Sequence, residues 1–133
     1  MKILLSLLMT TIVVTMNGQT ISNKEIITEI NRELGGDSWR LQGDNIIVDN
    51  GSFSVGRGIW GLSKVTYELK YEFFSVTGEG RNTYVLYVKC KEDNYCIEDQ
   101  ANTDSRGSSE LRLPIHDDEK RSYRVLNLIK SIR

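Results

Sequence analysis

Residues 64–74 read KVTYELKYEFF and carry the clearest secondary-structure signal in the chain. Apolar side chains from Val65 to Phe73 occupy every second position, and Lys, Thr and Glu stand between them. This period of two is typical of a strand with one face on a core. Residues 83–90 also alternate, but both faces carry bulk, as in a more central strand. We expect these two strands, joined by a turn at residues 78–80, to form the centre of an antiparallel sheet.

Two tight turns precede this pair of strands. Gly43-Asp44 separates residues 39–41 from residues 46–48, and Asn50-Gly51 separates residues 46–48 from residues 53–55. Two-residue turns in hairpins favour Gly, Asn and Asp because these residues tolerate a positive φ. The pattern predicts a small meander of three strands.

A helix is predicted on each side of the strands. Ser22 and Glu25 have the spacing of a capping box, and apolar residues at helical spacing lead to Gly35, so the first helix should cover residues 23–34. Near the other end, residues 111–115 alternate as a short strand. The acidic run 117–119 then marks the start of a helix that we expect to reach Ile132.

These elements predict an α+β fold: an N-terminal helix, an antiparallel meander sheet of about six or seven strands, and a long C-terminal helix packed on the sheet. This order of strands and closing helix resembles the pleckstrin-homology-like architecture. The sequence contains no repeat or linker, and its size suits one domain over residues 19–133.

The first 18 residues have the pattern of a secretory signal peptide. Lys2 is followed by an apolar run and a short polar exit that ends in Gly18-Gln19. The run is too short to span a bilayer of ~30 Å comfortably. We expect cleavage after Gly18, a periplasmic or secreted product, and no membrane span in the mature form.

The net charge of the chain favours no class of partner. The whole chain has a formal charge of −1, and loss of Lys2 with the leader would leave −2. Such a balance gives no reason to expect nucleic acid or an anionic membrane as a partner.

The two cysteines, Cys90 and Cys96, are predicted to form a disulfide across a polar hairpin loop at residues 91–95. Their spacing does not suit a thiol oxidoreductase, and His116, the one histidine, supplies too few further soft ligands for zinc.

The segment from Cys90 to the C-terminus combines a cysteine-bearing hairpin, the strand sequence Leu111-Arg112-Leu113-Pro114 and a charged helix. In this order it resembles small uncharacterised exported proteins of Bacteroidota. The signal-peptide exit, Gly18-Gln19, is similar to theirs. The resemblance implies a compartment and a fold, and it carries over no functional residue.

Residues 56–61, GRGIWG, fit the spacing of a dinucleotide-binding loop. A strand and not a helix is expected after Gly61, so we interpret the segment as a glycine-rich bend between strands. Trp60 and Arg57 in this bend could contact a ligand or partner, because such residues often anchor interfaces. The alternative is a tryptophan folded onto the core.

Two further sets of residues could carry chemistry. His116, just before the acidic run 117–119, is a possible general base, although no nucleophile is specified for it. Five carboxylates between residues 92 and 104 could bind calcium weakly or form a solvated loop, and residues 100–108 are expected to be mobile.

No set of residues forms a catalytic motif or a metal site, and no cofactor is expected. The sequence therefore favours a non-enzymatic binding or interaction module of the cell envelope, with a protein or a small ligand as its partner. The alternatives are a small envelope hydrolase centred on His116 and a weak calcium-binding protein.

Overall fold

A computed structural model describes residues 15–16, 19–49, 57–76, 78–99 and 107–133. In chain order the elements are β1 (Thr15–Met16), β2 (Gln19–Thr20), α1 (Asn23–Leu34), β3 (Trp39–Gln42), β4 (Asn45–Asp49), β5 (Arg57–Gly61), β6 (Val65–Val76), β7 (Glu79–Cys90), β8 (Glu98–Asp99), β9 (Glu110–His116) and α2 (Glu119–Lys130). The protein is therefore α+β, as predicted.

Strands β3 to β9 form two antiparallel sheets, in the orders β3-β4-β5-β8 and β6-β7-β9, and β1 pairs with β2 separately. The prediction of one meander sheet is wrong on this point. After β5 the chain makes a tight turn, in which the Lys64 amide donates to the Gly61 carbonyl over 3.1 Å, and β6 then pairs with β7 instead of β5. The free side of β5 is taken by β8.

The segment interpreted as a glycine-rich bend is in fact strand β5, which pairs with β4 over its whole length. Gly58 is needed there because a Cβ atom at this position would come within 2.5 Å of the Leu111 side chain. The predicted strand at residues 53–55 and the turn at Asn50-Gly51 lie outside the described residues.

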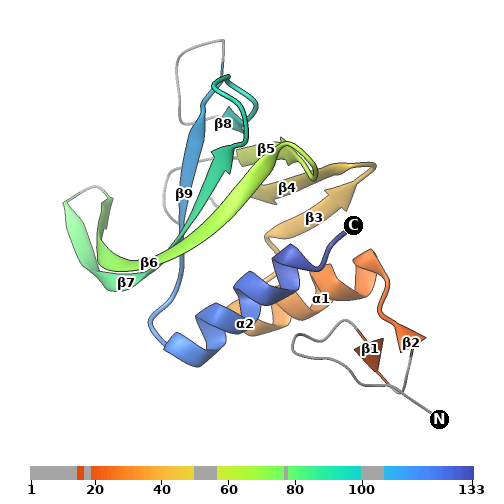
Figure 1. The fold of residues 1–133 in the computed structure, drawn as a ribbon. Helices are drawn as coiled ribbons and strands as arrows, with labels where there is room; N and C mark the ends of the chain where they lie inside the picture. The colour runs from red at the N-terminus through yellow and green to blue at the C-terminus, as the bar shows by residue number, and fades with distance from the viewer. Residues whose placement is uncertain (1–14, 17–18, 50–56, 77, 100–106) are drawn as a thin grey trace.

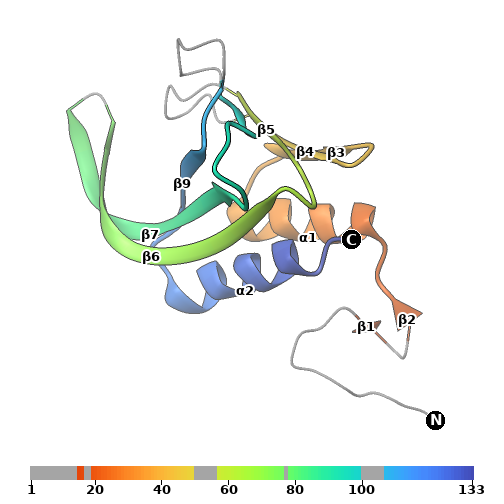
Figure 2. The ribbon, with the colours of Figure 1, turned by 45° about the horizontal axis from the view of Figure 1, so that its top comes forward.

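Local signals explain the ends of both helices. The Ser22 hydroxyl accepts from the Glu25 amide, the Glu25 side chain accepts from the Ser22 amide, and Gly35 ends α1 with a φ of 74°. Asp118 caps α2 by accepting from the Arg121 amide. Helix α2 ends at Lys130, two residues before the predicted end. The two helices lie side by side against the sheets (Figures 1 and 2).

Strands β6 and β7 form a hairpin of 12 residues on each side, longer than the predicted strands. β7 is central because β9 pairs with its other side, whereas β6 is an edge strand of the described sheet; the prediction that both are central is half wrong. The hairpin bends, and its tip reaches beyond the N-terminal end of α2 (Figures 1 and 2).

Cys90 and Cys96 form the predicted disulfide, with their Cα atoms 5.8 Å apart. The loop between them is not a hairpin, however. Because β9 already occupies the outer side of β7, the chain after the loop crosses to the other sheet, where β8 pairs with β5. The disulfide therefore links the end of β7 to the segment that carries the chain to the other sheet.

One hydrophobic core lies between the helices and the sheets. Its fully buried side chains include Ile26 and Ile30 of α1, Trp60 of β5, Leu86 of β7 and Ile129 of α2. No helix in the described part of the chain is long and apolar enough to cross a membrane.

Candidate interaction surface

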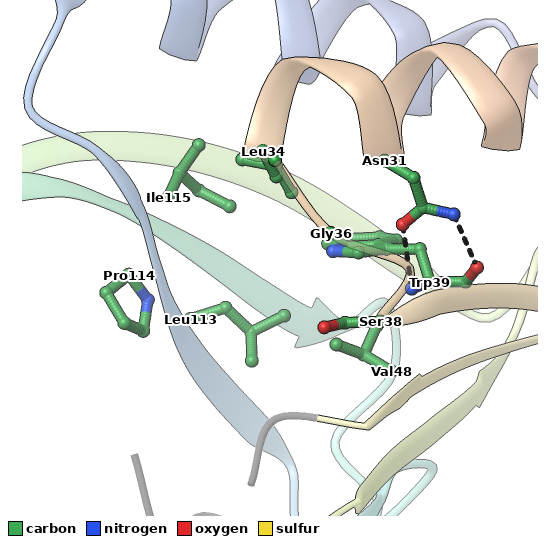
Figure 3. Close-up of a pocket in the computed structure, with 10 residues that line it drawn as sticks. Asn31, Leu34, Gly36, Ser38, Trp39, Val48, Leu113, Pro114 and Ile115 are labelled. Atoms are coloured by element: carbon green, nitrogen blue, oxygen red, sulfur yellow. Dashed lines mark hydrogen bonds between the residues drawn. The ribbon is translucent and has the colours of Figure 1, made fainter. Parts of the chain in front are cut away.

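A pocket of about 240 Å³ lies where α1 ends against β3, β4 and β9 (Figure 3). Leu34, Val48 and Leu113 line it together with polar groups, among them those of Asn31 and Ser38. The Asn31 amide accepts from the Trp39 amide and donates to the Trp39 carbonyl, each over 3.0 Å. These bonds occupy the polar atoms of the Asn31 side chain, and the volume is below the usual range for ligand sites. We therefore interpret the pocket as a packing defect and not as a binding site.

Trp60 and Arg57, the two residues singled out from the sequence, lie on opposite faces of β5. Trp60 is 1% exposed, and its ring packs edge-on against Trp39 with the ring centroids 5.9 Å apart. Its Nε1 donates to the Tyr67 hydroxyl over 3.0 Å. The alternative interpretation, a tryptophan folded onto the core, describes this position, and a partner could not reach the ring in this conformation.

Arg57 is half exposed and donates through Nε to Asp49 over 2.9 Å. Arg40 makes a second ion pair with Asp49 at 3.2 Å. The Arg57 hydrogen bond, with the charges of both arginines, lowers the pKa of the Asp49 carboxyl. Arg57 therefore fixes the end of the β4–β5 hairpin.

His116 is held by local contacts at the start of α2. The Asp118 amide donates to its Nδ1 over 2.9 Å, so this nitrogen is a hydrogen-bond acceptor from the backbone. The neighbouring Ser122 is fully buried and its hydroxyl donates to the His116 carbonyl, not to the ring. The basic nitrogen is thus engaged by the backbone, which does not favour a general base.

The acidic segment does not form a metal site among the described residues. No group of three or more His, Cys, Asp or Glu side chains in that part of the chain is placed to hold an ion. Asp104, one of the five carboxylates considered, lies outside the described residues, as does most of the segment predicted to be mobile.

Four aromatic side chains gather where the β6–β7 hairpin extends past α2. We call this the aromatic surface, and it consists of Tyr71, Phe73, Tyr84 and Tyr123. Tyr71 is 58% exposed, Phe73 is 63% exposed and Tyr123 is 44% exposed. The Tyr84 ring lies between Tyr71 and Tyr123, with centroid distances of 4.8 and 6.1 Å. Burial, followed by the nearby Glu119 charge, raises the pKa of Tyr84.

Phe73 lies on the backbone of the facing strand. A Cβ atom on Gly80 would come within 2.5 Å of the Phe73 ring. The absence of a side chain on Gly80 therefore leaves room for the tip of the Phe73 ring against β7, while most of the side chain stays exposed.

On the opposite face of the hairpin, polar side chains gather around Tyr87, next to a hollow of about 320 Å³ lined in part by Glu72 and Arg112. The Tyr87 hydroxyl donates to Glu72 over 2.6 Å, and the Lys70 amine stands 4.5 Å from the centre of the Tyr87 ring. Arg112 approaches the same ring at 6.0 Å. The Glu72 bond and burial raise the pKa of Tyr87. This network engages Glu72, Lys70 and Arg112, whereas the exposed rings of the aromatic surface are apolar groups in contact with solvent.

Sequence reasoning did not single out the aromatic surface, although it recognised the alternation that produces it. No family model matches the chain, and neither a curated protein nor a solved structure matches it. Function must therefore be argued from the chemistry of the described surfaces.

Proposed function

We propose that the protein is an exported, non-enzymatic binding module of the cell envelope, periplasmic or secreted, and that the aromatic surface contacts its protein partner. The supporting observation is the exposure of Tyr71, Phe73 and Tyr123 on one face. Large exposed aromatic groups are uncommon on isolated domains, and Tyr and Phe are enriched at interface centres. Their two χ angles also make them inexpensive to immobilise.

The disulfide supports the compartment in this proposal. Both cysteines of the chain are in the Cys90–Cys96 bond, and such bonds persist in oxidising compartments. Intact mass of the protein recovered from the envelope and medium tests this part. A chain that starts at Gln19 supports export and cleavage, whereas retention of Met1 contradicts them.

The architecture within this proposal remains pleckstrin-homology-like, supported by the seven strands β3 to β9 followed by a closing helix. The likeness to exported proteins of Bacteroidota belongs to the same proposal. It rests on the order of cysteines, Leu-x-Leu-Pro strand and charged helix.

Site-specific photocrosslinking tests the surface. A photoreactive phenylalanine analogue is placed at Tyr71 or Tyr123 and, as a matched control, at Tyr95, which is 52% exposed in the loop after β7. The analogue keeps an aromatic ring at each position. In living cells, crosslinks from positions 71 and 123 with none from position 95 support the proposal. Absence of crosslinks at all three, or equal yields, contradicts it.

A further inference from the structure

The outer edge of β6, over residues 65–73, runs beside the aromatic surface. Among the described strands β6 pairs with β7 alone, so no described strand lies along this outer edge. An unpaired edge is a template for another strand. The strand is also 12 residues long, enough for a continuous ladder.

A hollow of about 380 Å³ lies at the other end of the same strand. Its apolar lining comes from Leu62, Val65 and Tyr67 around the start of β6 and from Ile129 and Ile132 of α2. We call this the α2 hollow. Thus β6 presents exposed rings at Tyr71 and Phe73 and a hollow beside Val65 and Tyr67.

We propose that two copies of the chain pair antiparallel along the β6 edges, with Leu69 opposite Leu69 at a twofold axis. This inference rests on the proposed function and names the partner as a second copy. In that register Phe73 stands opposite Val65 and Tyr71 opposite Tyr67. Each copy therefore places its two exposed rings beside the α2 hollow of the other, as a self-complementary twofold interface requires.

Charge selects the same register. Pairing about Leu69 places Glu68 opposite Lys70 twice, and both side chains are exposed on the face away from the helices. Pairing about Lys70 would place Lys70 opposite itself and Glu68 opposite Glu72. Opposite charges across strands stabilise a pair and like charges destabilise it. Pairing about Tyr71 also satisfies charge, through Lys70 and Glu72, but leaves the α2 hollow empty.

Sedimentation equilibrium of the processed protein, purified with its disulfide intact, tests the dimer over the micromolar to millimolar range. We expect a reversible monomer–dimer equilibrium. Glu68→Lys should raise the dissociation constant roughly tenfold or more, because it creates two like-charged pairs. Glu68→Lys/Lys70→Glu should restore most of the affinity, because it exchanges the charges within each pair.

Phe73→Ser should also weaken the dimer, whereas Tyr95→Ser should leave the dissociation constant within about twofold of the original. Circular dichroism and melting temperature check that every variant folds; a variant that does not fold is replaced by Glu68→Gln or Phe73→Leu. A dissociation constant unaffected by Glu68→Lys, or no rescue in the folded double variant, overturns the Leu69 register.

The two proposals fail differently. A protein that stays monomeric at millimolar concentration, yet crosslinks to another protein from position 71, overturns the dimer and leaves the proposed function standing. A monomer without crosslinks at positions 71 and 123 overturns both. Crosslinks from position 71 to a second copy, together with the charge exchange, support both.

Discussion

The two halves of β6 follow one pattern and have opposite environments. In residues 65–69 the apolar face packs on the core under α2, and Val65 is only 4% exposed. In residues 71–76 the same face continues into solvent, where Phe73 is 63% exposed. Alternation therefore specifies which side chains share a face, whereas the helix decides which of them are buried.

Length explains why one half is covered. A helix of 12 residues is about 18 Å long, whereas a strand of 12 residues extends about 40 Å. Helix α2 can therefore cover less than half of a strand of equal residue count. We call residues 65–69 the covered half and residues 71–76 the open half, and the following predictions test their difference.

The largest expected effect is a cavity in the covered part of the sheet. Leu86 is fully buried and pairs with Leu69 on one side and Leu113 on the other. Leu86→Ala should lower the free energy of unfolding by about 2 to 5 kcal/mol, since it loses buried contacts and leaves a cavity. Urea denaturation measures it.

Phe73→Ala is the control for the open half, measured at concentrations at which the protein is monomeric. It should cost less than about 1 kcal/mol, because the Phe73 side chain is 63% exposed and loses little burial. Equal costs for the two variants would mean that the open half is as tightly packed as the covered half, which would contradict the comparison.

Removal of the disulfide should have the next largest effect. The bond closes a short loop next to Val65, which pairs with Cys90. Cys90→Ala/Cys96→Ala should cost about 2 kcal/mol in the chain-entropy model. Hydrogen exchange locates the effect: backbone amides of the covered half should exchange faster in the native state, relative to those of the open half.

A smaller effect should come from the hydrogen bond between Trp60 and Tyr67. Tyr67→Phe leaves the buried Trp60 Nε1 donor without its acceptor, at a cost of about 1 to 2 kcal/mol. Tyr71→Phe is the matched control, because that hydroxyl lies in the open half. An equal loss of stability in both variants would contradict this reasoning, because it would show that the cost does not depend on the buried Trp60 donor.

Features encoded in adjacent residues could be predicted from the sequence. The capping box at Ser22, the Gly35 C-cap and the Gly43-Asp44 turn are local, and the structure has a helix or turn at each. The Cys90–Cys96 bond was also predictable, because only five residues lie between the two cysteines.

Long-range pairing could not be predicted in the same way. Nothing near Trp60 indicates that β5 pairs with β8 across a gap of almost 40 residues, so its segment was interpreted as a bend. The aromatic surface was missed for a related reason. Its four rings come from β6, β7 and α2, and only the comparison of helix and strand lengths could have indicated that Tyr71 and Phe73 extend beyond α2.

The smallest predicted effect concerns alkaline pH. The hydrogen bond to Glu72 and burial raise the pKa of Tyr87 above its ordinary value of about 10. A raised pKa in the folded state means that the unfolded chain loses its proton first. The stabilisation is therefore complete below the unfolded pKa, and it is lost as pH rises through the folded pKa.

The urea midpoint should accordingly fall between about pH 9 and about pH 11, and it should fall less in Tyr87→Phe. Burial also raises the pKa of Tyr67 and Tyr84, so part of the pH dependence should remain in that variant. If the urea midpoint of Tyr87→Phe falls with pH as steeply as that of the original protein, Tyr87 is not a source of the pH dependence. Because Tyr87 contacts Glu72, Lys70 and Arg112, a weaker pH dependence in Tyr87→Phe would show that this network persists in solution. It would also support the choice of the opposite, aromatic surface as the one that remains available to a partner.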